Sequence, residues 1–115
     1  MSAEEKIQRY LFDKGFLHDC VVEHFSWHPK AKRFEVSIVD VNAGFLGLPE
    51  YPGRQPAKFV LDQVSALGIE LELLSERLVI FEVLLSGTGK GLCLDMGISP
   101  SGKISVACSE LSVVE

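Results

Sequence analysis

The chain has 115 residues, of which 47% are hydrophobic and 23% are charged, and its formal net charge at pH 7 is −5. A chain of this length is expected to form a single domain, residues 1–115, whose core needs no metal or disulfide support. The composition excludes a disordered chain, and the acidic balance disfavours nucleic acid as a partner, because a negative surface repels phosphate groups.

The acidic charge is concentrated in the second half of the chain. Residues 1–57 carry eight acidic and seven basic side chains, whereas residues 58–115 carry eight acidic and four basic ones. The second half therefore holds four of the five net negative charges. A basic protein is the electrostatic complement of such a surface.

The N-terminal sequence and the cysteines predict a cytoplasmic protein. Residues 1–10 lack the apolar stretch of a signal peptide, and no apolar run is long enough to span a membrane. The three cysteines, Cys20, Cys93 and Cys108, match neither a zinc-binding spacing nor a CxxC redox pair. We therefore expect free thiols, mostly buried, in a reducing compartment and no association with membranes.

Residues 2–14 are predicted to form a helix. Ser2 and Glu5 have the spacing of a capping box, and acidic residues in the first turn suit the helix dipole. Ile7, Tyr10 and Leu11 then share one mostly apolar face. Gly15 is a natural stop for the helix.

From Cys20 onward the polarity alternates with a period of two, which predicts a β-rich body over residues 20–115. One face of residues 20–27 is expected to carry Val21, Glu23, Phe25 and Trp27. In residues 33–39 the buried face carries Phe34, Val36 and Ile38. A turn at Pro29 makes the two runs a hairpin.

Five further runs read as strands: residues 57–67, 69–73, 78–85, 91–98 and 103–111. Gly68 falls between the first two and is either a β-bulge or a true break. Residues 78–85 are apolar on both faces, so we expect this strand to be covered on both sides, whereas residues 69–73 offer Glu70 and Glu72 to solvent. The predicted fold is mainly β: a single-domain antiparallel sandwich or partly open barrel of about seven strands with one short N-terminal α-helix.

Several catalytic and ligand-binding motifs fail on spacing. Residues 87–91, GTGKG, lack the first glycine and the final Ser or Thr of a phosphate-binding loop, and a strand follows them instead of a helix. Cys20, His24 and His28 share a strand face at separations of about 13 Å, too far apart for one metal ion. No GxSxG motif marks a nucleophile. We expect no metal and no cofactor.

A few polar residues still fit a ligand site. His18 and Asp19 lie together at the entrance of the first strand, and Glu23 and Glu82 stand in phase with apolar neighbours. A buried carboxylate of that kind has a raised pKa and can act as a general acid. The alternative is that each acid lies at a strand end or pairs with a basic side chain.

The segment NAGFLGLPEYPGRQP, residues 42–56, is a long loop with an unusual composition. Its prolines and glycines stiffen it and turn it, while its apolar side chains are too many for a solvated linker. Those side chains are Phe45, Leu46, Leu48 and Tyr51. The loop therefore either packs on the domain as a crossover or presents these side chains to a partner.

Several features follow one another along the chain: the N-terminal helix, LHD at residues 17–19, DVN at residues 40–42, GLPEYPG within the loop and the closing SPSGKISVACSELSV. This order gives the chain a resemblance to small bacterial β-rich domains, some of which look like immunity proteins of polymorphic toxin systems. The resemblance implies a non-enzymatic domain that binds and neutralises a toxin, and it supplies no catalytic residues.

Three hypotheses follow for the function. The first is a protein-interaction domain of immunity type that binds a basic toxin through Phe45, Leu46, Tyr51, Glu70 and Glu72. The second is a small-ligand-binding barrel or an enzyme with a site near His18, Asp19 and Glu82. The third is a self-associating structural domain that dimerises through the loop or a free edge strand.

Overall fold

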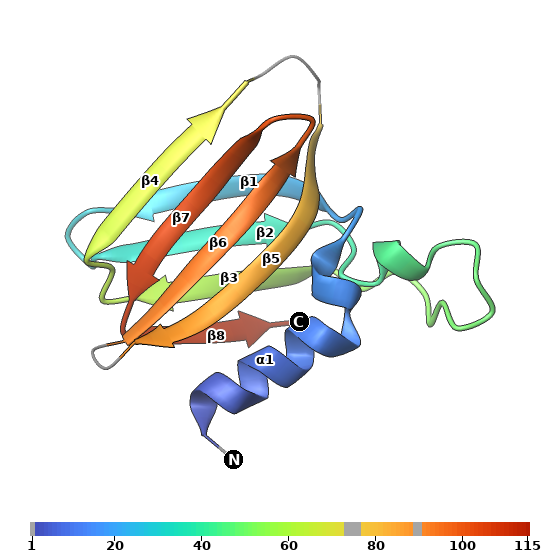
Figure 1. Cartoon of the computed structure of the whole chain (residues 1–115), viewed down its shortest axis with the longest axis horizontal. Helices are drawn as coiled ribbons and strands as arrows, with labels where there is room; N and C mark the ends of the chain where they lie inside the picture. Colours follow the sequence, from blue (N-terminus) through green and yellow to red (C-terminus); the bar gives the residue numbers. More distant parts are fainter. Residues whose placement is uncertain (1, 73–76, 89–90) are drawn as a thin grey trace.

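The computed structural model describes residues 2–72, 77–88 and 91–115, which form one N-terminal α-helix and eight strands (Figure 1). The helix is α1 (Ala3–Asp13), and two short 3-10 turns are η1 (Gly15–Leu17) and η2 (Ala43–Phe45). The strands are β1 (Val21–His28), β2 (Arg33–Ile38), β3 (Ala57–Asp62), β4 (Ala66–Leu71), β5 (Leu78–Thr88), β6 (Gly91–Ser99), β7 (Gly102–Cys108) and β8 (Glu110–Val114). The predicted mainly β fold with one N-terminal helix is confirmed.

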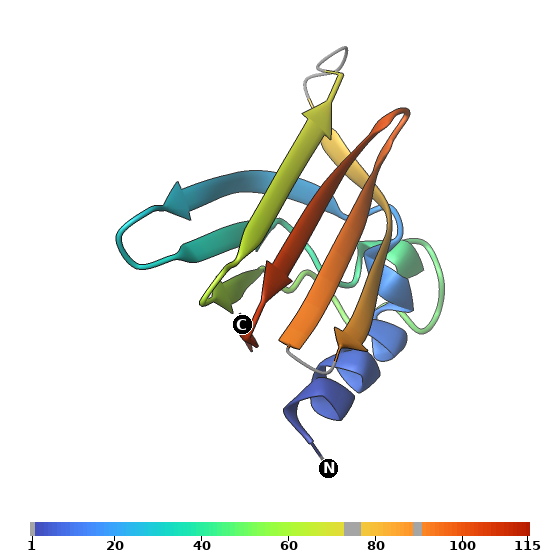
Figure 2. The same cartoon turned by 60° about the vertical axis from the view of Figure 1, so that its left-hand side comes forward.

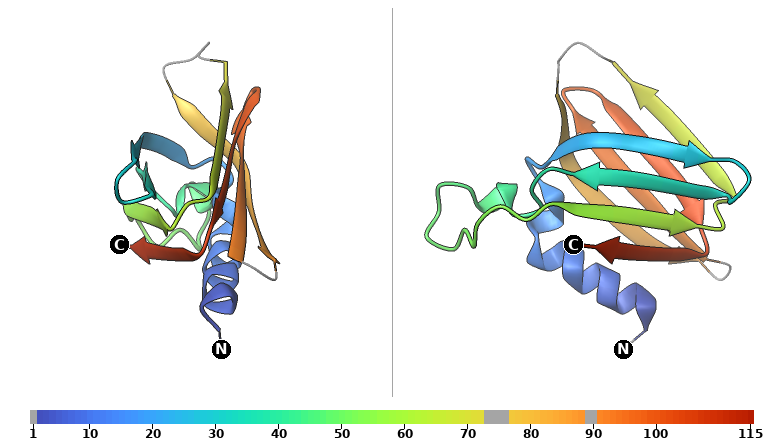
Figure 3. Two further views of the ribbon diagram at one scale, coloured as in Figure 1. Left: turned by 90° about the vertical axis from the view of Figure 1, so that its left-hand side faces the viewer. Right: turned by 180° about the vertical axis from the view of Figure 1, so that it is seen from behind.

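The strands form a single antiparallel sheet that bends into two layers. Their order is β4-β7-β6-β5-β1-β2-β3-β8. The sheet turns sharply between β5 and β1, so β4, β7, β6 and β5 make a front layer, and β1, β2, β3 and β8 make a back layer behind it (Figure 3). Val21 and Val22 join the layers by pairing with the start of β5. Of the two predicted alternatives, an antiparallel sandwich or a partly open barrel, this arrangement corresponds to the sandwich, built from one open sheet.

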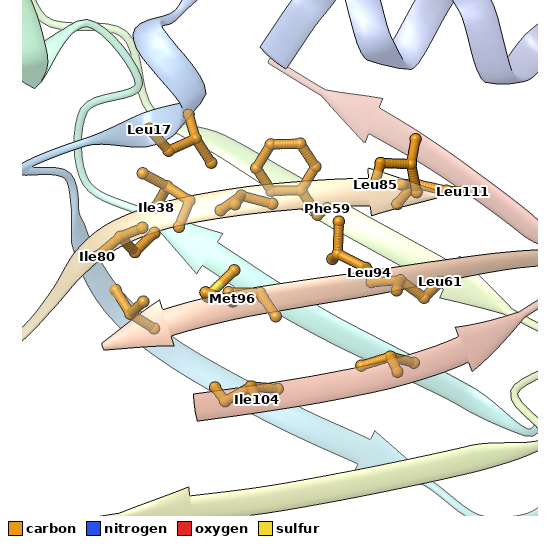
Figure 4. Packing of buried hydrophobic residues seen from close by; sticks show 14 of the residues in the cluster. Leu17, Ile38, Phe59, Leu61, Ile80, Leu85, Leu94, Met96, Ile104 and Leu111 are labelled. Atoms are coloured by element: carbon orange, nitrogen blue, oxygen red, sulfur yellow. The ribbon is translucent and has the colours of Figure 1, made fainter. Parts of the chain in front are cut away.

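The hydrophobic core lies between the two layers (Figure 4). The predicted inward set of β2, which is Phe34, Val36 and Ile38, is fully buried. Facing it from the front layer are Ile80, Val83, Leu94, Met96, Ile104 and Val106. Burial of this apolar surface is the main force that holds the layers together.

Helix α1 closes the open side of the sandwich between β5 and β8. The predicted capping box is present, since Ser2 and Glu5 exchange side-chain to backbone hydrogen bonds. Leu11 is buried against the core, and the amide of Gln8 donates a hydrogen bond to the carbonyl oxygen of Leu85. The hydroxyl of Tyr10 donates to the carboxylate of Glu115 just after β8. The helix therefore binds one backbone carbonyl of β5 and one side chain just after β8.

Two predicted strand boundaries were wrong. The closing run, residues 103–111, is divided at Ser109, where the chain leaves β7 in the front layer and enters β8 in the back layer. This division makes eight strands instead of about seven. Gly68 is neither a break nor a bulge, because it pairs regularly with Ser105 inside β4. The break falls at residues 63–65, where the chain crosses between the layers.

Two β-bulges overturn the predicted phases of β1 and β5. Val22 pairs with Ile38 and His24 with Ser37, so Glu23 is an extra residue in β1 and is exposed. The predicted face carrying both Val21 and Phe25 was therefore wrong. Phe81 is the extra residue in β5, and it stands 57% exposed. The expectation that residues 78–85 are covered on both sides was wrong as well.

Candidate functional site

The carboxylate of Asp40 fixes both ends of the loop formed by residues 42–56. Its Oδ1 accepts hydrogen bonds from the backbone N–H groups of Asn42 (2.9 Å) and Gln55 (3.1 Å), and its Oδ2 accepts one from the hydroxyl of Tyr51 (2.6 Å). Partial burial alone would raise the pKa of Asp40, but these hydrogen bonds outweigh it and lower the pKa. The same bond to Asp40 raises the pKa of Tyr51.

Asn42 provides a second anchor at the loop base. It is 5% exposed, and its amide Nδ2 donates to the carbonyl oxygen of Gly53 (2.9 Å). Its Oδ1 accepts a hydrogen bond from the ammonium group of Lys14 (2.9 Å), at the end of α1. The backbone N–H of Val41 also donates to the carbonyl of Gln55. The two ends of the loop are thus hydrogen-bonded to each other, and the first end is also bonded to Lys14 at the end of the helix.

The first part of the loop packs on the segment after α1. A Cβ atom placed on Gly44 would lie only 2.9 Å from the carbonyl oxygen of His18, so glycine permits this close approach. The ring of Phe45 lies against Gly15, and Phe45 is half-buried. Phe45 and Tyr51, two of the predicted partner-binding residues, therefore serve largely to hold the loop.

The middle of the loop projects beyond the sandwich and is exposed (Figure 1). We call residues 46–50 the loop tip. Leu46 is 69% exposed and Leu48 is 52% exposed, while backbone hydrogen bonds from Leu48 to Phe45 and from Tyr51 to Leu48 keep the chain in successive turns. Two leucines are therefore presented to solvent on a segment whose base is held by side-chain hydrogen bonds.

The turn between α1 and β1 lies beside the loop and adds exposed rings. Phe16, Leu17 and Asp19 have positive φ, a conformation that costs free energy in residues other than glycine. Buried Leu17 and a hydrogen bond from the N–H of Asp19 to the carbonyl of Ile80 (2.9 Å) hold this turn in place. The turn directs the imidazole of His18 onto Phe81, with 5.7 Å between ring centroids.

We define the end surface as the loop tip together with His18, Phe81 and the exposed Phe12 at the end of α1. Phe12 is 66% exposed and contacts Phe16 of η1 edge to face. The loop, η1 and the start of β5 all lie at the same end of the molecule (Figure 3). Exposed apolar side chains gathered in this way are typical of interaction surfaces.

The residues predicted for a ligand site are His18, Asp19 and Glu82, and the first two lie close to the loop predicted for partner binding. His18 and Asp19 form a pair (Nδ1 to Oδ2, 3.1 Å), but their side chains are more than half exposed and lie beside the loop. Glu82 follows Phe81 on the outer side of β5, opposite Gly97, and is half-exposed. His18 thus belongs to the end surface, and Asp19 and Glu82 follow its members His18 and Phe81 directly in the chain.

Glu70 and Glu72 lie elsewhere. Both are exposed at the end of β4, around a shallow hollow that also includes Lys103. Strand β4 is the far strand of the front layer, separated from β5 by β7 and β6. The sheet order therefore separates these two acids from Phe81 of the end surface by two intervening strands.

One contact resembles a hydrolytic triad without having its geometry. On the outer face of the back layer, His28 Nε2 lies 3.1 Å from Ser26 Oγ and 3.4 Å from Glu35 Oε2. A triad needs the two ring nitrogens to serve different partners, whereas here one nitrogen contacts both. Glu35 is also bound by the ammonium of Lys58 (3.0 Å).

The remaining predicted features are placed as follows. The three cysteines are free, with Cys20 and Cys108 buried and Cys93 half-buried, and burial raises the pKa of Cys20 and of Cys108 to about 11. Residues 89 and 90 of the GTGKG segment lie outside the described residues. In the part of the chain that is described, no helix is long and apolar enough to cross a membrane.

Comparison with known proteins finds a similar fold but does not assign the chain to a family. No family model and no curated protein matches the chain. A similar solved structure is the crystal structure of an uncharacterised protein from Neisseria gonorrhoeae, with a TM-score of 0.56 and 9% identity. The match covers 85% of this chain and 92% of that one. The likeness is one of fold alone.

Asp40, Asn42 and Gly44 were missed by sequence reasoning. All three lie at the start of the loop, where Asp and Asn often bind backbone groups and where glycine allows close packing. An Asp and an Asn next to a proline-rich loop were a usable signal for an anchored loop. The partners Tyr51 and Gly53 were not predictable from this signal.

Proposed function

We propose that this chain is a non-enzymatic protein-interaction domain that binds a partner protein through the end surface. The observation that supports it is the exposure of Leu46 and Leu48 on a loop whose base is fixed by Asp40 and Asn42. Ordering a loop before binding reduces the entropy that the complex must overcome, so side chains on a fixed loop make better anchors than those on a mobile one.

The chemistry of the end surface indicates the kind of partner. Its leucines fit apolar pockets, and two exposed acids accompany them, Glu50 in the loop tip and Asp19 paired with His18. With a net charge of −5, the chain attracts basic proteins at long range. A basic toxin neutralised in the manner of immunity proteins has this chemistry, and we propose it as the partner.

The test uses single serine substitutions in an affinity capture. The tagged chain, its Leu46→Ser and Leu48→Ser variants and a control, Leu84→Ser, are each used to capture proteins from the cells that make it. Leu84 is 50% exposed on β5, so the control removes a similar exposed leucine outside the loop. We expect one protein to be recovered by the wild type and the control and at least tenfold less by the loop variants.

Two further results decide the proposal. The captured protein, purified, should bind the wild-type chain with a Kd that rises at least tenfold for Leu46→Ser, as expected for an anchor residue. When expressed alone it should arrest growth, and co-expression of the chain should relieve that arrest. Equal recovery by all variants would refute the loop as the binding element. A harmless captured partner would refute the immunity role while leaving the interaction in place.

A further inference from the structure

The two terminal strands of the sheet are protected differently. Strand β8 has α1 beside it, and Tyr10 of the helix binds Glu115 at its end. Strand β4 pairs with β7 on one side, and in the part of the chain that the structure describes no strand pairs with its other side (Figure 2). The N–H and C=O groups along that second side are available to another strand.

Strand β4 also lacks the features by which proteins usually block an exposed edge. Edge strands are commonly interrupted by a bulge or proline, or carry lysine or an inward-pointing charge. Residues 66–71 contain no proline and no lysine, and their pairing with β7 is regular from Ala66 to Leu71. The one charged residue of the strand, Glu70, points outward with its neighbour Lys103.

The inward side chains of β4 are apolar and incompletely covered. Leu67 and Ile69 lie opposite the buried Val106 and Ile104 of β7, and Leu71 continues the same stripe. Ile69 is nevertheless 41% exposed, because β4 extends past the back layer (Figure 1). On the outer face, a Cβ atom on Gly68 would meet no atom within 4 Å, so there is open space above it.

We propose that two copies of this chain pair through β4, antiparallel, about a two-fold axis at Ile69. With a two-fold axis perpendicular to the sheet, odd-numbered residues lie opposite odd-numbered ones and even-numbered opposite even-numbered ones. The inward side chains of one copy therefore lie beside the inward side chains of the other. Ile69 then meets Ile69 of the second copy, and Leu67 meets Leu71. Glu70 falls opposite Gly68, where the open space accommodates its side chain.

Charge and the pairing of apolar side chains favour this register over its neighbours. Moving the axis to Glu70 would set two like-charged carboxylates directly opposite each other, which is unfavourable. Moving the axis to Gly68 would pair residues 66–70 and leave the apolar Leu71 without a partner inside the opposite strand. With the axis at Ile69, residues 67–71 pair instead, so all three residues of the apolar stripe have partners and only Ala66 is left out. A contact through one strand is smaller than a standard interface of about 1,600 Å², so the dimer is reversible and depends on concentration.

Cysteine substitutions test the register directly. In a Cys93→Ser background, which leaves only the buried Cys20 and Cys108, the variants Gly68→Cys, Ile69→Cys and Glu70→Cys are each oxidised with oxidised glutathione. Directly opposite residues have Cα atoms about 4.5–5.5 Å apart, within disulfide range, whereas diagonal neighbours are about 7–8 Å apart. We expect Ile69→Cys to form a cross-linked dimer and the other two to remain largely monomeric. Equal cross-linking of all three, or preferential cross-linking of another, would refute the proposed pairing.

Light scattering tests the dimer without cross-linking. At high concentration the wild type is expected to approach twice the chain mass of 12.7 kDa and to dissociate on dilution. Ile69→Lys places a charge at the axis and should give single chains at every concentration, with an unchanged circular dichroism spectrum. Leu84→Lys, at a somewhat more exposed site on the same layer, should still dimerise. A wild-type chain that stays monomeric at the highest soluble concentration would overturn the proposal.

Discussion

The carboxylate of Asp40 accepts three hydrogen bonds from residues that are far apart along the loop, and this explains why a segment with three glycines and three prolines adopts one shape. An ionised acceptor forms stronger hydrogen bonds than a neutral one. The ordering of the loop therefore depends on a residue before it and not on the loop residues alone.

Replacing this carboxylate should loosen the loop base. Asp40→Asn keeps the size of the side chain but loses the charge that receives the Tyr51 hydroxyl and two backbone N–H groups. We expect a loss of about 2 kcal/mol in the free energy of unfolding, measured with urea. Asp13→Asn, which removes only an exposed bond to Arg9 within α1, should cost about 0.3 kcal/mol. Equal losses would show that Asp40 does not anchor the loop.

The same carboxylate makes part of the stability depend on pH. Partial burial acts to raise the pKa of Asp40, but hydrogen bonds from Tyr51, Gln55 and Asn42 lower it overall. A lowered pKa in the folded state means that the stabilisation is present above the ordinary carboxyl pKa of about 3.9 and is lost as the pH falls through the folded value. The stability difference between wild type and Asp40→Asn should therefore be constant near neutral pH and shrink below about pH 4. A difference that grows on acidification would contradict this assignment.

Gly44 is the second residue on which the loop geometry depends. A methyl group there would press on the carbonyl oxygen of His18, a backbone atom that cannot rotate away. We expect Gly44→Ala to lower the free energy of unfolding by about 1–2 kcal/mol, as other overpacked positions do. Gly68→Ala, whose new methyl meets no atom, should change it by no more than about 0.5 kcal/mol in thermal melts of dilute protein.

At the scale of elements, α1 completes a sandwich that its strands leave open. The pairing between β1 and β5 involves Val21 and Val22, so the later part of β5 has carbonyl groups without a strand on that side. The amide of Gln8 reaches one of them, at Leu85. An amphipathic helix is thus used here as an edge cover as well as a source of core residues.

Removing this amide should weaken the attachment of the helix. Gln8→Leu leaves the Leu85 carbonyl without its donor, at an expected cost of about 1–2 kcal/mol. Amide hydrogen exchange within α1 should become faster than in the wild type, while exchange in β6 and β7 changes less. Lys6→Leu alters an exposed position on the same helix and serves as the control. If both variants exchange alike, the bond to Leu85 does not hold the helix.

Most elements could be predicted because local patterns determine them. The capping box, the turn at Pro29 and the alternation of Phe34, Val36 and Ile38 are each set by neighbouring residues. The bulges at Glu23 and Phe81 could not be predicted, since a bulge depends on the partner strand as well. One inserted residue exchanges the side chains that point inward with those that point outward along the rest of the strand. This explains why Phe81 and Leu84 are exposed in a run whose apolar composition predicts burial on both faces.

At the scale of the whole molecule, strand order decides which predicted residues meet. Leu46 was predicted and is exposed, but the close approach of its loop to His18, at Gly44, follows from the packing of η2 on η1, which no local pattern encodes. Glu70 was grouped with the loop because of its charge, whereas the sheet order places it at the opposite edge of the front layer. The sequence therefore indicates candidate site residues, but it does not show which of them lie close together in the fold.

The sheet order also predicts that the two proposed surfaces act independently. The end surface and β4 lie on opposite sides of the front layer, with β7 and β6 between them (Figure 1). Substitutions at sites this far apart, without shared contacts, have additive effects. Leu46→Ser should reduce partner binding and leave the dimer mass unchanged, whereas Ile69→Lys should abolish the dimer and leave the Kd of a single end surface unchanged.

Binding measured on an immobilised partner distinguishes this arrangement from a shared surface. A dimer carries two loop tips and can bind two immobilised partners at once, so the wild type should dissociate more slowly than Ile69→Lys at high surface density. The two should dissociate equally at low density, where each chain meets one partner. A Kd in solution that rises with Ile69→Lys would show that the partner contacts β4, and the end surface would then be only part of the interface.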